Sequence, residues 1–158
     1  MAVVPAVVTN VARFNWPRMF GSLQTFASIA YFKVGQGGWV NPGTGAVPRT
    51  PDPSLTDLDI IVNPSRYAGS LPVGATGWFQ KTLTGAAFAF EAPTTLVITC
   101  LLDFGDYNAD PISNPTAYPN IWEIGAYDQN GVMVAYGTFA AQTKNSSKQL
   151  ENVIRITF

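Results

Sequence analysis

Carboxylates are the side chains with which this sequence could do acid–base chemistry, and four are candidates: Asp103, Asp106, Asp110 and Glu123. A glycoside hydrolase needs one such pair, with one group as the acid and the other as the base or nucleophile. The spacing of these four does not distinguish them from surface charges. The chain also has no histidine, the commonest general base at neutral pH. Cysteine proteases, Ser-His-Asp hydrolases and histidine-ligated zinc sites are therefore excluded, and we expect no catalytic residue.

The segment Asp106-Tyr107-Asn108-Ala109-Asp110 carries the alternating oxygen ligands that begin a calcium loop, with Asp103 nearby. Such a loop needs a glycine next and a glutamate further on, whereas Pro111 follows here and no glutamate occurs before Tyr118. The pattern favours a solvated loop with side-chain-capped turns over a cation site. We expect no bound metal.

Two further motifs are interpreted as structural. Gly35-Gln36-Gly37-Gly38-Trp39 lacks the Lys-Ser/Thr of a phosphate-binding loop and the third glycine of a dinucleotide site, so it predicts a tight turn that presents Trp39. Cys100 is the only cysteine and lies inside the apolar run 96–102, which predicts a small core residue without a disulfide partner. No cofactor is expected.

The composition indicates a protein that binds other proteins. The chain has 158 residues, enough for one domain with a core, and only 12% of them are charged while 47% are hydrophobic. A surface that is neutral and rich in aromatic residues tends to be buried against partners. The net charge is −1 and the basic residues are scattered, so nucleic acid is not an expected partner.

Neither a membrane span nor a secretory signal is expected. The longest uncharged apolar run, 96–102, is far below the ~20 residues that a membrane helix needs. Residues 1–8 are apolar but contain Pro5 and no basic group. We therefore expect a soluble protein that is intracellular at synthesis.

The elements that must position these residues are mostly strands. The pattern predicts an extended arm or edge strand over 2–14, helical turns within 19–26 and 54–58, and long Pro/Gly-rich or polar loops over 41–53 and 103–119. The strand 95–102, apolar on both faces, is the expected central strand. We predict an antiparallel sandwich or open barrel, with an N-terminal arm over 1–25 and a single domain over 26–158. The predicted strands are 27–34, 59–62, 77–83, 88–91, 95–102, 121–127, 132–139 and 152–158.

The strand pair from Trp122 to Phe139 is the clearest local feature. Asp128-Gln129-Asn130-Gly131 separates the two runs, and Asn130-Gly131 can adopt the positive φ angles of a tight hairpin turn. Neither face of this ribbon is polar. Both faces must therefore be covered, either by strands of the same sheet and core or by another subunit.

The same hairpin carries a resemblance to a known family. Residues 123–131, E-I-G-A-Y-D-Q-N-G, followed by V-A-Y-G at 134–137, resemble the E-I-G-x-Y-D-x-x-G … x-A-x-G segment of tail-collar fibre and related tail proteins of bacteriophages. Residues 29–38, with Gly35-Gln36-Gly37, look like that family's N-terminal G-x-G segment. A Pro/Thr-rich loop follows, and Leu58 stands near the family's apolar anchor.

The resemblance implies a virion protein of the tail: a baseplate, collar or fibre-adaptor subunit that attaches fibres to the tail. Its expected partners are other tail proteins and copies of itself in a symmetric assembly. Family members often continue into a fibre shaft and a receptor-binding tip, whereas this chain ends at Phe158, so we expect only the attachment module. The expected protein-interface residues are Phe14, Trp16, Trp39, Trp122, Tyr127, Tyr136 and Phe139.

Two alternatives from other classes stay open. A capsid decoration protein would share the neutral composition. A carbohydrate-binding module would use Trp39, Trp78 or Trp122 as a stacking platform beside the carboxylates of 103–110.

Overall fold

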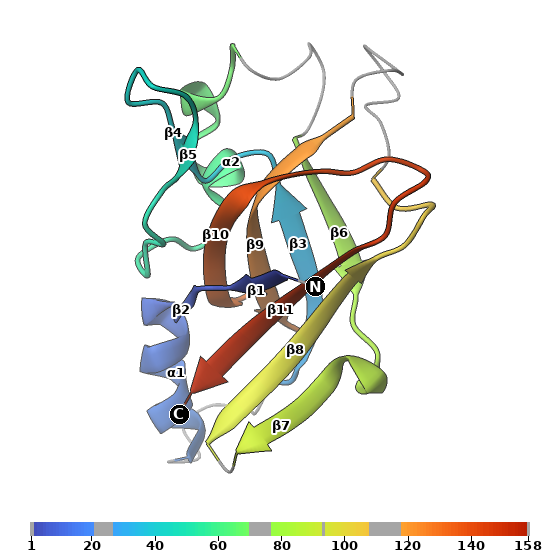
Figure 1. The fold of residues 1–158 in the computed structure, drawn as a ribbon. Coiled ribbons are helices and arrows are strands. Elements are labelled where there is room, and N and C mark those ends of the chain that lie inside the picture. Colours follow the sequence, from blue (N-terminus) through green and yellow to red (C-terminus); the bar gives the residue numbers. More distant parts are fainter. Residues whose placement is uncertain (1, 21–26, 70–76, 93, 108–117, 158) are drawn as a thin grey trace.

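The computed structural model describes residues 2–20, 27–69, 77–92, 94–107 and 118–157. Two sheets pack face to face, as Figure 1 shows, so the predicted mostly β class and its sandwich form are confirmed. The helices are α1 (Asn10–Phe20) and α2 (Asp59–Val62), with 3-10 turns η1 (Pro64–Arg66) and η2 (Gly85–Ala87). The strands are β1 (Ala2–Val4), β2 (Ala6–Val8), β3 (Ile29–Gly35), β4 (Trp39–Val40), β5 (Val47–Pro48), β6 (Trp78–Thr82), β7 (Phe88–Ala92), β8 (Thr95–Leu102), β9 (Asn120–Asp128), β10 (Met133–Thr143) and β11 (Leu150–Thr157).

The two sheets differ in size and order. One has four strands in the order β1-β11-β8-β7, and the other has five in the order β2-β10-β9-β3-β6. The pairing of β1 with β11 is parallel, and the other ladders of both sheets are antiparallel. A separate ribbon of β4 and β5 lies beside the five-stranded sheet (Figure 1).

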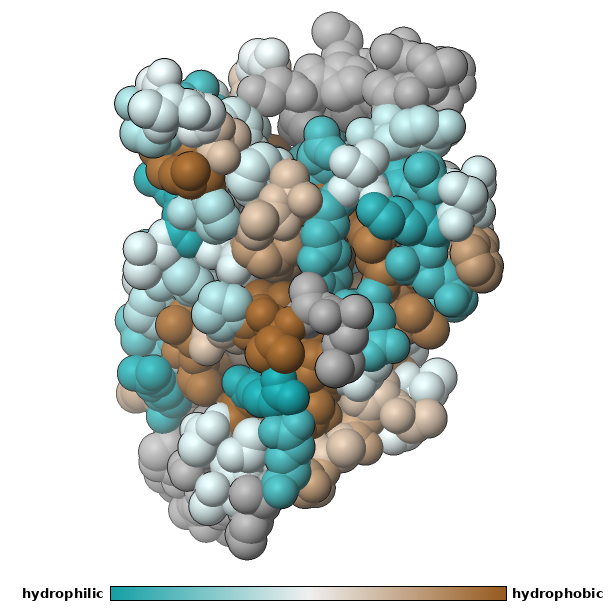
Figure 2. Space-filling model, in the orientation of Figure 1, coloured by the Kyte–Doolittle hydropathy of each residue, from teal (hydrophilic) through white to brown (hydrophobic). Residues whose placement is uncertain are grey.

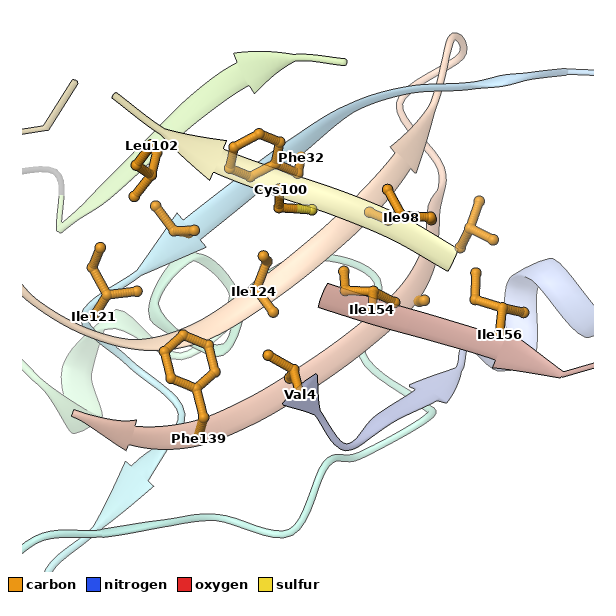
Figure 3. Close-up of a cluster of buried hydrophobic side chains, with 14 of the residues drawn as sticks. Val4, Phe32, Ile98, Cys100, Leu102, Ile121, Ile124, Phe139, Ile154 and Ile156 are labelled. Carbon is orange, nitrogen blue, oxygen red and sulfur yellow. The ribbon is translucent and has the colours of Figure 1, made fainter. Parts of the chain in front are cut away.

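The main core fills the space between the sheets. Ile98 and Cys100 of β8 and Ile154 of β11 face Ile124 of β9 and Phe139 of β10, as Figure 3 shows. Successive side chains of a strand point to opposite faces, so β8, β9 and β11 each direct one apolar face into this layer. The strand predicted over 95–102 is confirmed as an interior strand, and Cys100 is fully buried in the core as predicted.

The N-terminal residues belong to the sandwich. β1 and β2 are edge strands of different sheets, with Pro5 between them where the chain crosses from one sheet to the other. The predicted extended conformation fails from residue 10 onward, because α1 begins there. Thr9 stabilises this start: its Oγ1 accepts from the Ala12 N–H at 3.3 Å, while the Thr9 N–H donates to the Val134 carbonyl at 3.0 Å.

The predicted hairpin is confirmed in the middle of the five-stranded sheet. Its turn differs in detail, because of the two central residues only Gly131 has a positive φ (83°). The Asp128 Oδ1 accepts from the Asn130 and Val132 N–H groups at 2.8 and 2.9 Å, and Gly131 N–H donates to the Asp128 carbonyl. This pattern is typical of a three-residue loop that ends in a left-handed glycine.

The outer face of the hairpin is covered by the chain's own segment 55–67. A second cluster, which includes Leu58, Ile60, Tyr67, Tyr127 and Tyr136, fills the space between this segment and the five-stranded sheet. The structure thus favours coverage by the same chain over coverage by another subunit. None of the helices in the described ranges is long and apolar enough to cross a membrane.

The strand predicted over 59–62 is wrong, because these residues form the short helix α2. Asp59-Ile60-Ile61-Val62 has the β-branched composition of a strand. Its backbone N–H groups, however, find a carboxylate on the sheet below. Tertiary contact therefore overrides the local preference.

Candidate functional site

Glu123 is the residue at which the sheet and segment 55–67 are joined. Its side chain projects from the outer face of β9 and is completely buried. Oε2 accepts from the Asp59 N–H at 2.8 Å and from the Tyr136 hydroxyl at 2.8 Å, and Oε1 accepts from the Ile60 N–H at 3.0 Å. Because these are the first N–H groups of α2, the carboxylate fixes the start of that helix on the sheet.

Burial dominates the electrostatics of Glu123. Loss of hydration raises its pKa from 4.5 to about 7, although the three donated hydrogen bonds favour the charged form. The negative charge of Asp59 adds to the rise. In turn, burial and the Glu123 carboxylate raise the pKa of the Tyr136 hydroxyl, so this hydroxyl stays a donor.

Two glycines, one at the end of β3 and one in the turn that follows, make room for this carboxylate. A Cβ on Gly35 would lie 2.5 Å from the Glu123 Oε1, and a Cβ on Gly37 would lie 2.6 Å from the same atom. Both distances are shorter than real carbon–oxygen contacts. The motif Gly35-Gln36-Gly37 is therefore needed for the close approach of the Glu123 side chain.

Asp59 is the second buried carboxylate and gathers four side chains. Its Oδ1 accepts from Asn63 Nδ2 at 2.6 Å and from Arg66 Nη1 at 2.7 Å. Its Oδ2 accepts from the Tyr67 hydroxyl, and the Arg49 Nε lies 3.9 Å away. Burial and this bond raise the pKa of Tyr67. Asp59 thus holds two arginines that come from different segments.

A polar cleft of about 460 Å³ lies above Asp59. Loop 49–56 forms one wall, α2 and η1 form the other, and Tyr136 of β10 contributes from the sheet. The loop is held by its backbone, since Arg49 N–H donates to the Gly38 carbonyl at 2.9 Å and Pro53 O accepts from Asn10 N–H at 2.7 Å. The cleft is lined by Arg49, Thr50, Asp52, Ser54, Leu55, Thr56, Asp59, Val62, Asn63, Arg66 and Tyr136.

A largely buried ion pair joins β3 to segment 55–67. Lys33 Nζ is 2.8 and 3.0 Å from the two carboxylate oxygens of Asp57, and it lies 4.5 Å from the ring centre of Tyr127. The Tyr127 hydroxyl donates to Asp57 Oδ1 at 2.5 Å. Burial, the bond to Asp57 and its charge all raise the pKa of Tyr127. These contacts hold Asp57, and with it segment 55–67, against the five-stranded sheet.

The predicted interface residues are scattered. Phe14 of α1 is 63% exposed, whereas the side chain of Trp16 lies outside the described part of the chain. Trp39 and Trp122 are partly buried and contact each other, with ring centres 6.2 Å apart. The remaining three are buried inside the chain's own fold and are thus unavailable to a partner in this conformation: Tyr127, Tyr136 and Phe139.

Two of the carboxylates proposed for cation or sugar chemistry pair with a lysine rather than with Glu123. Asp103 and Asp106 bind Lys81 Nζ at 2.7 and 2.5 Å. Asn108 and Asp110 lie outside the described residues. Within the described ranges, no three carboxylate or thiol groups come together in a way that could hold a metal ion.

Sequence reasoning missed the residues that build the cleft. Arg49, Asp59 and Arg66 lie in segments interpreted as loop or strand, and no local pattern marks them. The only available signal was the polar, Pro-rich loop 41–53, which indicated a functional or contact-ordered segment.

The segments on which the family resemblance depends meet at one place. Gly35 and Gly37 pack on Glu123, Leu58 is completely buried beside it, and Tyr136 donates to it. No protein-family model, curated protein or solved structure matches the chain. Function must therefore be inferred from the residues and their geometry.

Proposed function

We propose that this protein is a structural subunit of a bacteriophage tail, a baseplate, collar or fibre-adaptor protein that attaches fibres through protein–protein contacts. The observation that carries the proposal is that the segments of the family resemblance all contact Glu123 or lie beside it. Three motif segments, separated widely in the sequence, form one buried unit, in which Gly35 and Gly37 make room for Glu123 and its carboxylate binds the start of α2. Such interdependence supports a resemblance to a family rather than a chance match of short turns.

The exposed surface fits a protein with several neighbours. Large apolar side chains are exposed on separate elements, among them Val3 (54%), Phe14 (63%) and Phe90 (72%). Figure 2 shows apolar surface near the centre of the visible face, where β1 and β11 lie, and again at the β4–β5 ribbon. Contacts with partners would remove such surface from water.

Open strand edges provide a second means of attachment. Among the described residues, β6 and β7 each pair with a single strand and end their sheets. An unpaired edge offers backbone donors and acceptors to an added strand from another chain. Fibre attachment by strand addition is compatible with this architecture.

Electron microscopy of the phage that encodes the chain tests the proposal. A nonsense mutation in the gene is expected to give particles whose heads form but whose tails lack fibres. Antibody bound to this chain in wild-type particles is expected on the tail. Labelling of the head, or normal fibres in the mutant, would contradict the proposal, and head labelling would favour a capsid decoration protein.

Light scattering of the purified chain gives an independent test. A tail subunit is expected to self-associate as its concentration rises, because symmetric assemblies repeat the same contact. A strictly monomeric protein at the concentrations of virion assembly would count against the proposal.

A further inference from the structure

The cleft above Asp59 has more unused donors than acceptors. The Asp59 carboxylate already accepts from Tyr67, Asn63 and Arg66. Asp52 Oδ1, at the rim, accepts from both the backbone N–H and the hydroxyl of Ser54 at 2.8 and 2.6 Å. The protein itself thus engages both oxygens of Asp59 and one oxygen of Asp52.

The two arginines retain most of their donors. A guanidinium has five N–H groups. Among the described residues, Arg66 donates to Asp59 through Nη1, and Arg49 approaches the same carboxylate only to 3.9 Å. Their side chains are 46% and 37% exposed and line the cleft. Asp59 thus orients two partly used guanidinium groups toward one opening.

We propose that this cleft binds an acidic side chain carried by a segment of a partner protein. The inference rests on the proposed function, because it takes the partner to be another protein of the assembly. A carboxylate is the acceptor that fits paired guanidinium groups best. A volume of about 460 Å³ exceeds one carboxylate and suits a short stretch of chain.

The remaining lining residues fit such a segment. Thr50, Thr56 and Asn63 offer hydroxyl and amide groups for the peptide backbone, while Leu55 and Val62 offer apolar contact. Asp52 is the negative charge on the rim, and the positive charge of Arg66 helps to lower its pKa, so an acid that enters the cleft competes with Asp52 for Arg66. The walls are held by backbone hydrogen bonds of Arg49 and Pro53, so little ordering is needed on binding.

Nuclear magnetic resonance of the full chain tests the acid preference directly. The probe is the blocked peptide acetyl-Ala-Ala-Glu-Ala-Ala-amide, with the glutamine peptide as its matched control. The glutamate peptide is expected to shift the Arg49, Arg66 and Thr56 signals with a Kd in the millimolar range, and the glutamine peptide to bind at least about tenfold more weakly. Equal binding of the two peptides, or no shift with the glutamate peptide, would overturn the proposal.

A carboxylate placed in the cleft by mutation gives a test that spares the Asp59 network. Thr56 is exposed and lines the cleft. Thr56→Glu is expected to raise the Kd of the glutamate peptide at least about tenfold, because the new carboxylate competes for the same arginines. Thr56→Gln should change this Kd by less than about threefold. Arg49→Gln should also weaken the binding of the glutamate peptide, whereas Arg155→Gln, on another face, should leave the binding unchanged. Unchanged binding to Thr56→Glu and Arg49→Gln would overturn the proposal.

Assembly of the variants in phage separates this inference from the proposed function. Loss of fibres with Thr56→Glu but not with Thr56→Gln would support the cleft as the attachment point. Normal fibres with Thr56→Glu would overturn the inference and leave the tail role intact. Absence of the wild-type chain from tails would overturn the tail role, even if the peptide preference were observed.

Discussion

The Glu123 carboxylate occupies the space that a side chain at Gly37 would need. A Cβ on Gly37 would lie 2.6 Å from Oε1 and 2.7 Å from the backbone nitrogen of Ile60. Because the backbone cannot give way cheaply, Gly37→Ala is expected to lower the free energy of unfolding by about 2–4 kcal/mol, measured by urea denaturation.

Gly69→Ala is the matched control for that substitution. Apart from Gly69 itself and its two chain neighbours, no atom of the described residues lies within 4 Å of a Cβ built at this position. Its free energy of unfolding should stay within about 0.5 kcal/mol of the wild type. Equal effects of Gly37→Ala and Gly69→Ala would contradict the close packing of Glu123.

Glu123 should make stability depend on pH. Burial raises its pKa from 4.5 in the unfolded chain to about 7 in the folded one, so between these values the folded state holds a proton that the unfolded state has lost. The contribution of Glu123 to the free energy of unfolding is therefore complete below about pH 4.5. It decreases by on the order of 3 kcal/mol as the pH rises toward about 7. Unfolding of wild type and Glu123→Gln across this range measures the effect.

The difference in unfolding free energy between wild type and Glu123→Gln reports on the Glu123 carboxyl group alone. Glu123→Gln is expected to be less stable throughout, since an amide nitrogen would face one of the N–H donors. The difference in unfolding free energy between wild type and Glu123→Gln should be largest near pH 4.5 and should shrink as pH rises. A difference that stays constant with pH would show that folding leaves the pKa of Glu123 unshifted, and one that grows with pH would show that folding lowers it; either would contradict the raised pKa.

The core strands could be predicted from the sequence, whereas the helix at Asp59 and the cleft above it could not. Strand 95–102 was predictable because a short, nearly continuous apolar run is typical of a strand that is buried on both faces. The helix at Asp59 was not, because its stability comes from Glu123, which is remote in sequence. The same holds for the cleft: Arg49 and Arg66 meet only because both bind Asp59. Long-range polar contacts leave no local pattern.

The Lys33–Asp57 pair should contribute more than a surface ion pair. The two side chains are only 11% and 27% exposed, and the Tyr127 ring lies beside the ammonium group. Lys33→Met leaves the Asp57 carboxylate without its cation and is expected to cost about 2 kcal/mol of unfolding free energy. A double-mutant cycle with Asp57→Asn should give a coupling of about 1–2 kcal/mol.

The exposed pair of Arg155 and Glu91 is the control for this cycle. Its side chains are 33% and 49% exposed. Because solvent screens such a pair, Arg155→Met should lower the free energy of unfolding much less than Lys33→Met does. If Lys33→Met proved no more costly than Arg155→Met, the buried pair would not be a stabilising contact.

Cys100 should be unreactive in the native protein. Its side chain is completely buried in the sandwich core, and burial raises the pKa of its thiol. Since the thiolate is the reactive form, a thiol reagent is expected to label Cys100 only after unfolding. Mass spectrometry with and without denaturant measures this. Rapid labelling of the folded chain would show that the core opens locally at β8.

The hairpin turn can be tested by comparing its two central residues. Gly131 has a φ of 83°, whereas Asn130 is not among the described non-glycine residues with positive φ. Gly131→Ala is therefore expected to cost about 1 kcal/mol of unfolding free energy, while Asn130→Ala should change it by less than about 0.5 kcal/mol. A two-residue turn would need positive φ at both positions and would make Asn130→Ala costly as well. Equal losses in the two variants, measured by urea denaturation, would thus contradict the three-residue loop.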